Sequence, residues 1–203
     1  MSGKIYIASF QMRGKWAPGP PIPHLKVNVT SCQGKTNPNR LDFSPMTPIE
    51  GSYKGYWNFE SYWQSGKIYE GVPLEKSKKW WLECQTPKRK YPLGKGKTVL
   101  GARYDGYDEE MDYLTARQKI YIPEYYQLIK DRKMTQKWHQ EYLAGKNIVI
   151  YDLDGPRDSE GEVTCLEFNL ELLKEKIIDL RYPLGHGYLV AALVQGLQLE
   201  EFN

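Results

Sequence analysis

The residues best suited to chemistry in this 203-residue chain lie in one short segment, Trp57 to Lys67. Read as a helix, the segment places Trp57, Glu60, Gln64 and Lys67 along one face, because positions three and four apart are neighbours on a helix. This face offers a ring for stacking, a carboxylate, an amide and an ammonium. A carboxylate bordered by large rings loses water, and desolvation raises its pKa. The plain alternative is a surface helix on which Glu60 and Gln64 form a weak pair.

A second feature is a basic segment, residues 76–97, which we call the basic segment throughout. It contains eight basic residues and one acidic residue, while the whole chain carries a net charge of only +3. Trp80, Trp81 and Tyr91 are interleaved with these charges. Basic groups hold phosphates and aromatic faces stack on bases, so the pattern fits a nucleotide or nucleic acid. The alternative is a solvated basic face with Trp80 or Trp81 in the core.

Two further groups stand next to expected elements. Gly185-His186-Gly187 precedes a predicted helix, whose free backbone N–H groups could bind an anion. His186 either takes part in the reaction or simply faces solvent. Asp152 and Asp154 follow a predicted buried strand, at a position where functional loops begin. The other histidines and the three scattered cysteines have no metal-ligand spacing, so we expect no metal, no disulfide framework and no cofactor.

The Trp57–Lys67 segment, together with residues 41–49 before it, resembles the signature of the NADAR superfamily, the YbiA-like N-glycosidases. That signature reads Glu-His-Tyr-Phe-Gln-x-x-Lys. The chain matches it at Glu60, Tyr62, Gln64 and Lys67, with Trp63 in place of Phe and a serine in place of His. The order of later elements is also similar, although the chain lacks the family's Trp beside its Asp and the Asn of its last Gly-rich loop. The resemblance covers roughly residues 41–197.

The resemblance implies hydrolysis of an N-glycosidic bond in an ADP-ribose-like or phosphoribosyl small molecule, or in an ADP-ribosylated nucleic acid. Such a bond breaks through an oxocarbenium-like transition state. Glu60 would stabilise the positive charge or orient water, and Asp152 or Asp154 would be a second acid. The remaining candidates would stack on the base, contact phosphates or otherwise line the substrate site: Trp57, Trp63, Gln64, Lys67, Lys79, Trp81, Arg103, Gly185, His186 and Gly187.

The expected fold is a single α+β domain over residues 1–203, predominantly helical with a small sheet and YbiA-like. Residues 1–40 would form an N-terminal extension with two strands, at 4–10 and 25–31, followed by a loop over 32–56. Further strands are expected at 98–103 and 146–152. Helices are expected at 57–70, 74–84, 168–179 and 188–197, and a long helical region at 108–143 would break before Pro123.

The composition bounds the remaining choices. The chain has 16 Tyr and 6 Trp against 5 Phe, rings with a polar tip that suit a wet interface or a stacking site. It has no apolar run of ~18 residues and no signal-peptide core, so we expect no membrane partner and a cytoplasmic or nuclear protein that is not secreted. Two other functions stay open. One is a non-catalytic nucleotide or nucleic-acid binding protein that uses the basic segment, and the other is an interaction module built on exposed rings.

Overall fold

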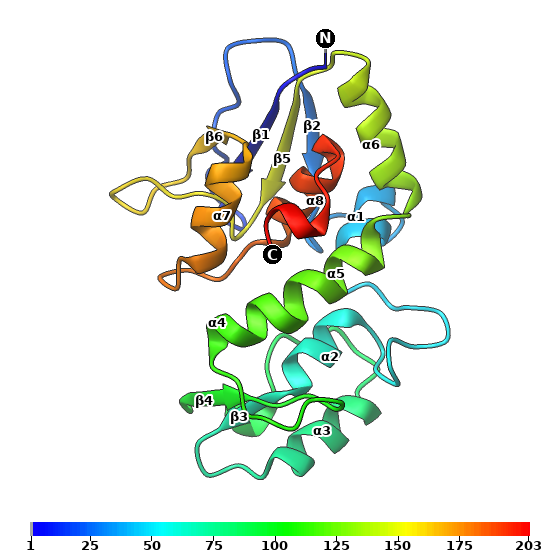
Figure 1. Ribbon diagram of the computed structural model, residues 1–203, viewed down its shortest axis with the longest axis vertical. Helices are drawn as coiled ribbons and strands as arrows, with labels where there is room; N and C mark the ends of the chain where they lie inside the picture. Colours follow the sequence, from blue (N-terminus) through cyan, green and yellow to red (C-terminus); the bar gives the residue numbers. More distant parts are fainter. Residues whose placement is uncertain (1) are drawn as a thin grey trace. The chain divides into compact units, whose positions relative to one another are not determined.

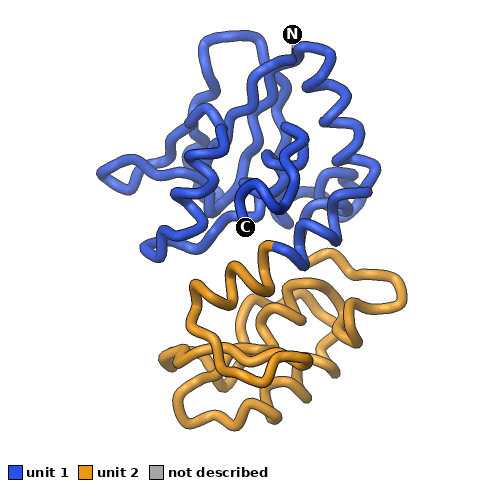
Figure 2. The backbone as a smooth tube through the Cα atoms, in the orientation of Figure 1, with its two compact units in different colours: residues 1–44, 123–203 blue, residues 45–122 orange. Residues whose placement is uncertain are grey.

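The computed structural model describes residues 2–203 and divides them into two compact units (Figures 1 and 2). Unit 1 combines the chain up to Ser44 with Pro123–Asn203, and unit 2 is Pro45–Ile122. Unit 1 holds a four-stranded mixed sheet with helices, and unit 2 holds a two-stranded sheet with short helices. The expectation of an α+β protein, mainly helical with a small sheet, is confirmed.

The sheet of unit 1 has the order β2-β5-β1-β6. Its strands are β1 (Ile5–Ser9), β2 (Leu25–Asn28), β5 (Ile148–Asp152) and β6 (Cys165–Glu167). β5 runs parallel to both β1 and β2, and β6 is antiparallel to β1. Every residue of β1 and β5 is buried, as is typical of parallel strands covered on both faces. The first 40 residues therefore supply part of the centre of the sheet, where the sequence suggested an extension.

Helix α8 (His186–Gln195) is the central helix of unit 1 and packs on β1, β5 and α6 (Lys133–Leu143), as the ribbon in Figure 1 shows. All residues of α8 from Gly187 to Val194 are buried, and a helix that is apolar all round belongs inside a protein. It ends at Gly196, whose φ of +91° is a left-handed conformation that glycine adopts without steric cost.

The loop expected over residues 32–56 contains a short helix, α1 (Pro38–Phe43). Asn37 caps its start by accepting hydrogen bonds from the backbone N–H groups of Asn39 and Arg40, and Pro38 occupies the first helical position. Both are start signals that the sequence carried. The sequence predicted a loop here because the stretch contains several prolines, and proline is also a strong loop signal.

Unit 2 is built around aromatic rings. Its elements are α2 (Phe59–Ser65), β3 (Lys67–Tyr69), α3 (Leu74–Glu83), the 3-10 turn η1 (Pro92–Gly94), β4 (Val99–Ala102), α4 (Tyr113–Ala116) and the π-helical turn η2 (Arg117–Tyr121). Tyr62 contacts the rings of four neighbours: Tyr53, Tyr56, Phe59 and Tyr104. Trp63 stacks on Tyr104 with ring centroids 5.9 Å apart, and the Tyr104 hydroxyl donates to the Trp63 carbonyl over 2.8 Å. Much of the tyrosine excess is therefore core packing with satisfied polar tips.

The helical region at 108–143 breaks later than the sequence indicated. The chain passes from α4 through η2 into α5 (Ile122–Ile129) without interruption at Pro123, and the break falls at residues 130–132, before α6. Ile122 donates to the carbonyl of Arg117, five residues back, so the widened turn accommodates a proline that cannot donate a backbone bond. The prediction of a break before Pro123 is wrong for this reason.

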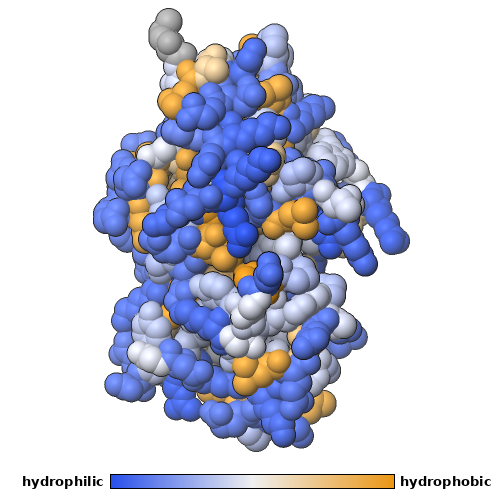
Figure 3. Space-filling view, turned by 90° about the vertical axis from the view of Figure 1, so that its right-hand side faces the viewer, coloured by the Kyte–Doolittle hydropathy of each residue, from blue (hydrophilic) through white to orange (hydrophobic). Residues whose placement is uncertain are grey.

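The face drawn in Figure 3 is mostly hydrophilic, with apolar residues in small separate groups. Within residues 2–203, none of the helices combines the length and the apolar character that crossing a membrane requires.

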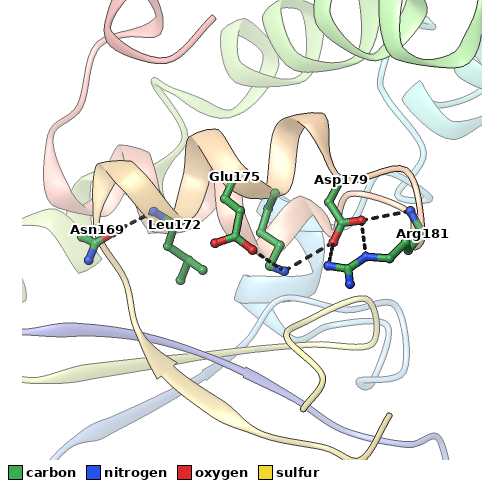
Figure 4. Close-up of polar contacts among 6 residues, drawn as sticks. Asn169, Leu172, Glu175, Asp179 and Arg181 are labelled. Atoms are coloured by element: carbon green, nitrogen blue, oxygen red, sulfur yellow. Dashed lines mark hydrogen bonds and ion pairs between the residues drawn. The ribbon is translucent and has the colours of Figure 1, made fainter. Parts of the chain in front are cut away.

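Helix α7 (Leu170–Ile178) is fixed at both ends by polar contacts (Figure 4). The Asn169 side chain accepts from the backbone of Leu172 over 2.8 Å at its start. After its end, Arg181 donates from Nε and Nη2 to the two carboxylate oxygens of Asp179, each over 2.9 Å, and Lys176 Nζ lies 3.5 Å from Asp179 Oδ2. The hydrogen bonds from the Arg181 side chain hold the pKa of Asp179 well below its usual range.

This pair gives a pH-dependent stability. A depressed folded pKa stabilises the fold above the unfolded value of about 3.9, and the contribution is lost as the pH falls below that value. We expect Asp179→Asn to reduce the urea midpoint at pH 7 modestly, because Arg181 is exposed, and to reduce it less at pH 3. Urea titrations at both pH values, with the exposed Asp131→Asn as control, measure this, and an equal loss at both pH values contradicts it.

Candidate functional site

Helix α2 positions Glu60 and Gln64 in unit 2. Its N-cap is Asn58, whose side chain accepts from the Ser61 backbone over 2.7 Å, and it ends before Gly66. The expected helix over 57–70 is therefore shorter, with Trp57 before its start and Lys67 opening β3. The predicted four-member helical face is wrong in extent, and only Glu60 and Gln64 lie on the helix. Gly66 at the C-cap has a right-handed φ of −75°, and a Cβ atom there would lie 2.4 Å from the Tyr104 ring. Close packing therefore explains the glycine at the point where α2 ends and Lys67 opens β3.

Glu60 is held by its partner on the next turn. Gln64 Nε2 donates to Glu60 Oε1 over 2.7 Å, and Gln64 itself is buried. The ring-bearing side of α2 (Phe59, Tyr62 and Trp63) is buried. Burial is the main cause that raises the pKa of Tyr104 and of Tyr69, and the charge of Glu60 adds to both. The negative charge of Glu60 therefore influences the buried tyrosine hydroxyl groups, because charges are weakly screened in a buried environment.

Lys67 is half-buried beside this wall. Burial lowers the pKa of its ammonium, Glu60 partly offsets that loss, and Lys90 adds to it. Its Nζ lies 5.7 Å from the centroid of the Trp63 ring. Both residues line a pocket of about 290 Å³ together with Val99–Ala102, Asp112, Tyr113 and Ala116. The sequence did not predict this pocket. The expected strand at 98–103 was the only sign of one of its walls, and a strand alone does not indicate a pocket.

The other candidates of unit 2 differ in accessibility. Trp57 is half-buried and Arg103 is exposed. Lys79 is exposed and lies 4.0 Å from Glu83. Trp81 is fully buried against Trp80, with ring centroids 4.8 Å apart, so its faces leave no room for a base. The structure thus gives Trp81 the core position that was the alternative, whereas Trp63, although mostly buried, lines the pocket of unit 2.

In unit 1, Asp152 ends strand β5 and meets the start of α8. Its side chain is buried, and Oδ2 accepts from the Gly187 backbone N–H over 2.7 Å and lies 3.3 Å from His186 Nδ1. His186 Nε2 is 3.0 Å from the carbonyl of Val29. The N-terminus of α8 is therefore served by a carboxylate of the chain itself, where the sequence suggested an external anion.

The two glycines of this loop have a packing reason. A Cβ atom at Gly185 would lie 2.6 Å from the Asp154 carbonyl oxygen and 2.8 Å from Asp152 Oδ2. One at Gly187 would lie 2.9 Å from the Cβ of Asp152. Neither glycine has a positive φ. Close approach of the Asp152 strand end thus explains the Gly-x-Gly spacing, which by itself cannot be distinguished from a phosphate loop.

Asp154 is exposed and lines a small pocket of about 130 Å³ in unit 1. Arg157, Lys176 and Arg181 contribute to the same lining. This volume is well below the ~300 Å³ at which ligand sites usually start, so the pocket does not hold a nucleotide. Within residues 2–203, no group of three or more His, Cys, Asp or Glu side chains could hold a metal ion.

Comparisons of this chain with protein-family models, with curated proteins and with solved structures found no match.

Proposed function

We propose that the protein is an N-glycosidase that hydrolyses the bond between a nucleobase and a ribose phosphate or ADP-ribosyl group. The observation that carries the proposal is the Glu60 carboxylate on α2, which accepts from Gln64 Nε2 over 2.7 Å and whose charge adds to the raised pKa of the buried Tyr104 and Tyr69. Such a bond breaks with positive charge on the ribose, which a fixed carboxylate stabilises. The resemblance of the Trp57–Lys67 segment to the NADAR signature supplies the reaction class and, with it, a YbiA-like fold. The three scattered cysteines favour a reducing, cytoplasmic or nuclear location.

Each residue of the proposed site has a separate catalytic or binding role. Glu60 stabilises the oxocarbenium or orients the attacking water, and Gln64 fixes the position of its carboxylate. Trp57 and Trp63 offer rings to the base, and Lys67 contacts a phosphate. Of the two acids that the resemblance suggests, Asp154 has an exposed side chain, whereas the side chain of Asp152 is engaged at α8.

A turnover assay tests the proposal. The protein is incubated separately with DNA carrying ADP-ribosyl-guanine, with NAD and with free ADP-ribosyl nucleosides, and the released ADP-ribose is quantified by mass spectrometry. We expect release from at least one of the three. Release from none of them, by a protein that melts cooperatively, rejects the N-glycosidase.

The exposure of the basic segment favours a second function, the binding of nucleic acid. Five of its cations have no ion pair or hydrogen bond from the side chain within residues 2–203: Lys76, Lys88, Arg89, Lys90 and Lys95. By contrast, Lys78 lies 2.6 Å from Asp105. Unpaired, hydrated cations are free to replace the counterions of a phosphate backbone.

This surface predicts a salt dependence. We expect the affinity for single-stranded DNA to fall as salt rises, and the triple change of Lys88, Arg89 and Lys90 to Ser to reduce the slope of log K against log salt by about 2, since each phosphate contact contributes about 0.7. Fluorescence anisotropy at several salt concentrations measures it. Charge changes at Lys130, Lys133 and Lys137 in unit 1 are the matched control. An unchanged slope in the basic-segment variant removes this surface from the contact.

A further inference from the structure

The pocket of unit 2 has mostly aromatic and aliphatic walls and two charged residues, one positive and one negative. Its lining consists of the Trp63 and Tyr113 rings, the strand β4 from Val99 to Ala102, and Ala116, with Lys67 and Asp112 as its charged members. Mutual backbone bonds of 2.8 Å between Ala102 and Met111 tie β4 to the segment before α4. Val99, Leu100 and Tyr113 are exposed large apolar residues, so this part of the lining is open to a ligand. Rings and aliphatic walls of this kind accept a flat ring system.

The Lys67 ammonium needs a partner that the chain does not supply. Among residues 2–203 its Nζ makes no hydrogen bond or ion pair, and its described contact is the Trp63 ring at 5.7 Å. Burial lowers the pKa of this group, which is the sign of a charge that has lost water without full compensation. An anionic group placed at Nζ would restore that compensation with a charge-assisted hydrogen bond.

Asp112 limits where the anion lies. Its Oδ1 accepts from the Thr115 backbone N–H over 2.6 Å, and this bond lowers the pKa of the carboxyl, so it is charged at neutral pH. A second anion at this end of the pocket would be repelled. The volume, about 290 Å³, stands at the lower limit of ordinary ligand sites, which span ~300–1,000 Å³. The pocket therefore suits one ring system with one anionic group and is too small for a dinucleotide.

We propose that this pocket binds the mononucleotide part of the substrate, with a heteroaromatic ring against β4 and the exposed side of Tyr113 beside Trp63, and a single phosphate on Lys67. The proposal rests on the proposed function for the choice of a nucleotide. It adds that recognition is confined to one base and one phosphate, and that β4, outside the signature segment, forms half of the site.

Calorimetric titration with adenosine 5′-monophosphate, adenosine and inorganic phosphate tests this in the full chain. We expect the monophosphate to bind at least 10-fold more tightly than either fragment, because a bond between charged groups changes affinity by about 10–100-fold. Lys67→Met should lose at least 10-fold for the monophosphate and little for adenosine. Leu100→Asp, at a side chain that is exposed and so compatible with folding, should weaken both. Lys119→Met, at an exposed lysine of the same unit that pairs with Glu109, should leave all three unchanged.

Three results overturn the proposal: no binding of the monophosphate by the wild type, equal affinity for adenosine, or a loss below twofold in both Lys67→Met and Leu100→Asp. If Lys67→Met does not fold, Leu100→Asp decides. Binding with the expected variant pattern but no hydrolysis of any N-riboside supports the pocket and counts against the N-glycosidase. If Lys67→Met and Leu100→Asp both hydrolyse the substrate with unchanged KM, the N-glycosidase is supported and the pocket is rejected as its binding site.

Discussion

Glu60→Gln is expected to lower the rate of N-glycosidic hydrolysis by about 10²–10⁴-fold, the usual cost of removing a group that transfers protons or orients water in the transition state. Glutamine keeps the length of the side chain, and its amide oxygen can still accept from Gln64 Nε2, so the local fold remains. In the proposed reaction, the variant lacks the negative charge that would face the ribose as it becomes cationic. Since that interaction is made in the transition state, kcat and kcat/KM should fall together.

Single-turnover assays with the best of the three substrates give the measurement, and calorimetric binding of the monophosphate shows whether the ground state is affected. Glu75→Gln, an exposed carboxylate in the first turn of α3, is the matched control and should keep full activity. Activity of Glu60→Gln equal to wild type removes Glu60 from catalysis. A loss confined to KM would assign Glu60 to substrate binding instead of the chemical step.

The parts of the fold that the sequence predicted are those with strong local signals. The alternating or apolar runs around Val27 and Ile150 are strands, and a helix begins within the range expected from residue 57 onward. The missed pieces depend on tertiary context. β3 follows a glycine that ends α2 and pairs with β4 through contacts that no local pattern carries. η2 carries the helix through Pro123 by a change of hydrogen-bond spacing, which a rule about proline does not anticipate.

The site shows the same division. Glu60 and Gln64 were predicted as neighbours because four-residue spacing on a helix is a local property, and they are joined by a hydrogen bond. Trp81 is an error of another kind, since a tryptophan among lysines can face either the solvent or the core, and only packing decides. Likewise, Gly185 and Gly187 fit a phosphate loop and a tight strand–helix contact equally well until the position of Asp152 is known.

That contact leads to the second large expected effect, on stability. Asp152 is buried at the end of the central strand β5, and its Oδ2 accepts from Gly187 N–H over 2.7 Å at the start of the buried helix α8. We expect Asp152→Ala to lower the free energy of unfolding by about 2–4 kcal/mol, because it leaves a buried N–H unpaired and removes an anion from the positive end of the helix. Asp152→Asn retains an acceptor and should cost about half as much.

The stability measurement also separates two roles for this acid, which the sequence assigned to catalysis. If Asp152 joins sheet and helix, urea unfolding of Asp152→Ala shifts to lower midpoint while Asp131→Ala, an exposed acid of the same unit, stays within ~0.5 kcal/mol of wild type. Hydrolysis by the folded fraction of Asp152→Asn should then remain near the wild-type rate. Wild-type stability combined with a rate lost by 100-fold would reverse the conclusion and return Asp152 to the reaction. The structural role is expected because Asp152 is buried and its Oδ2 already accepts a hydrogen bond from Gly187 N–H. The same oxygen lies 3.3 Å from His186 Nδ1, so it is not available to a substrate.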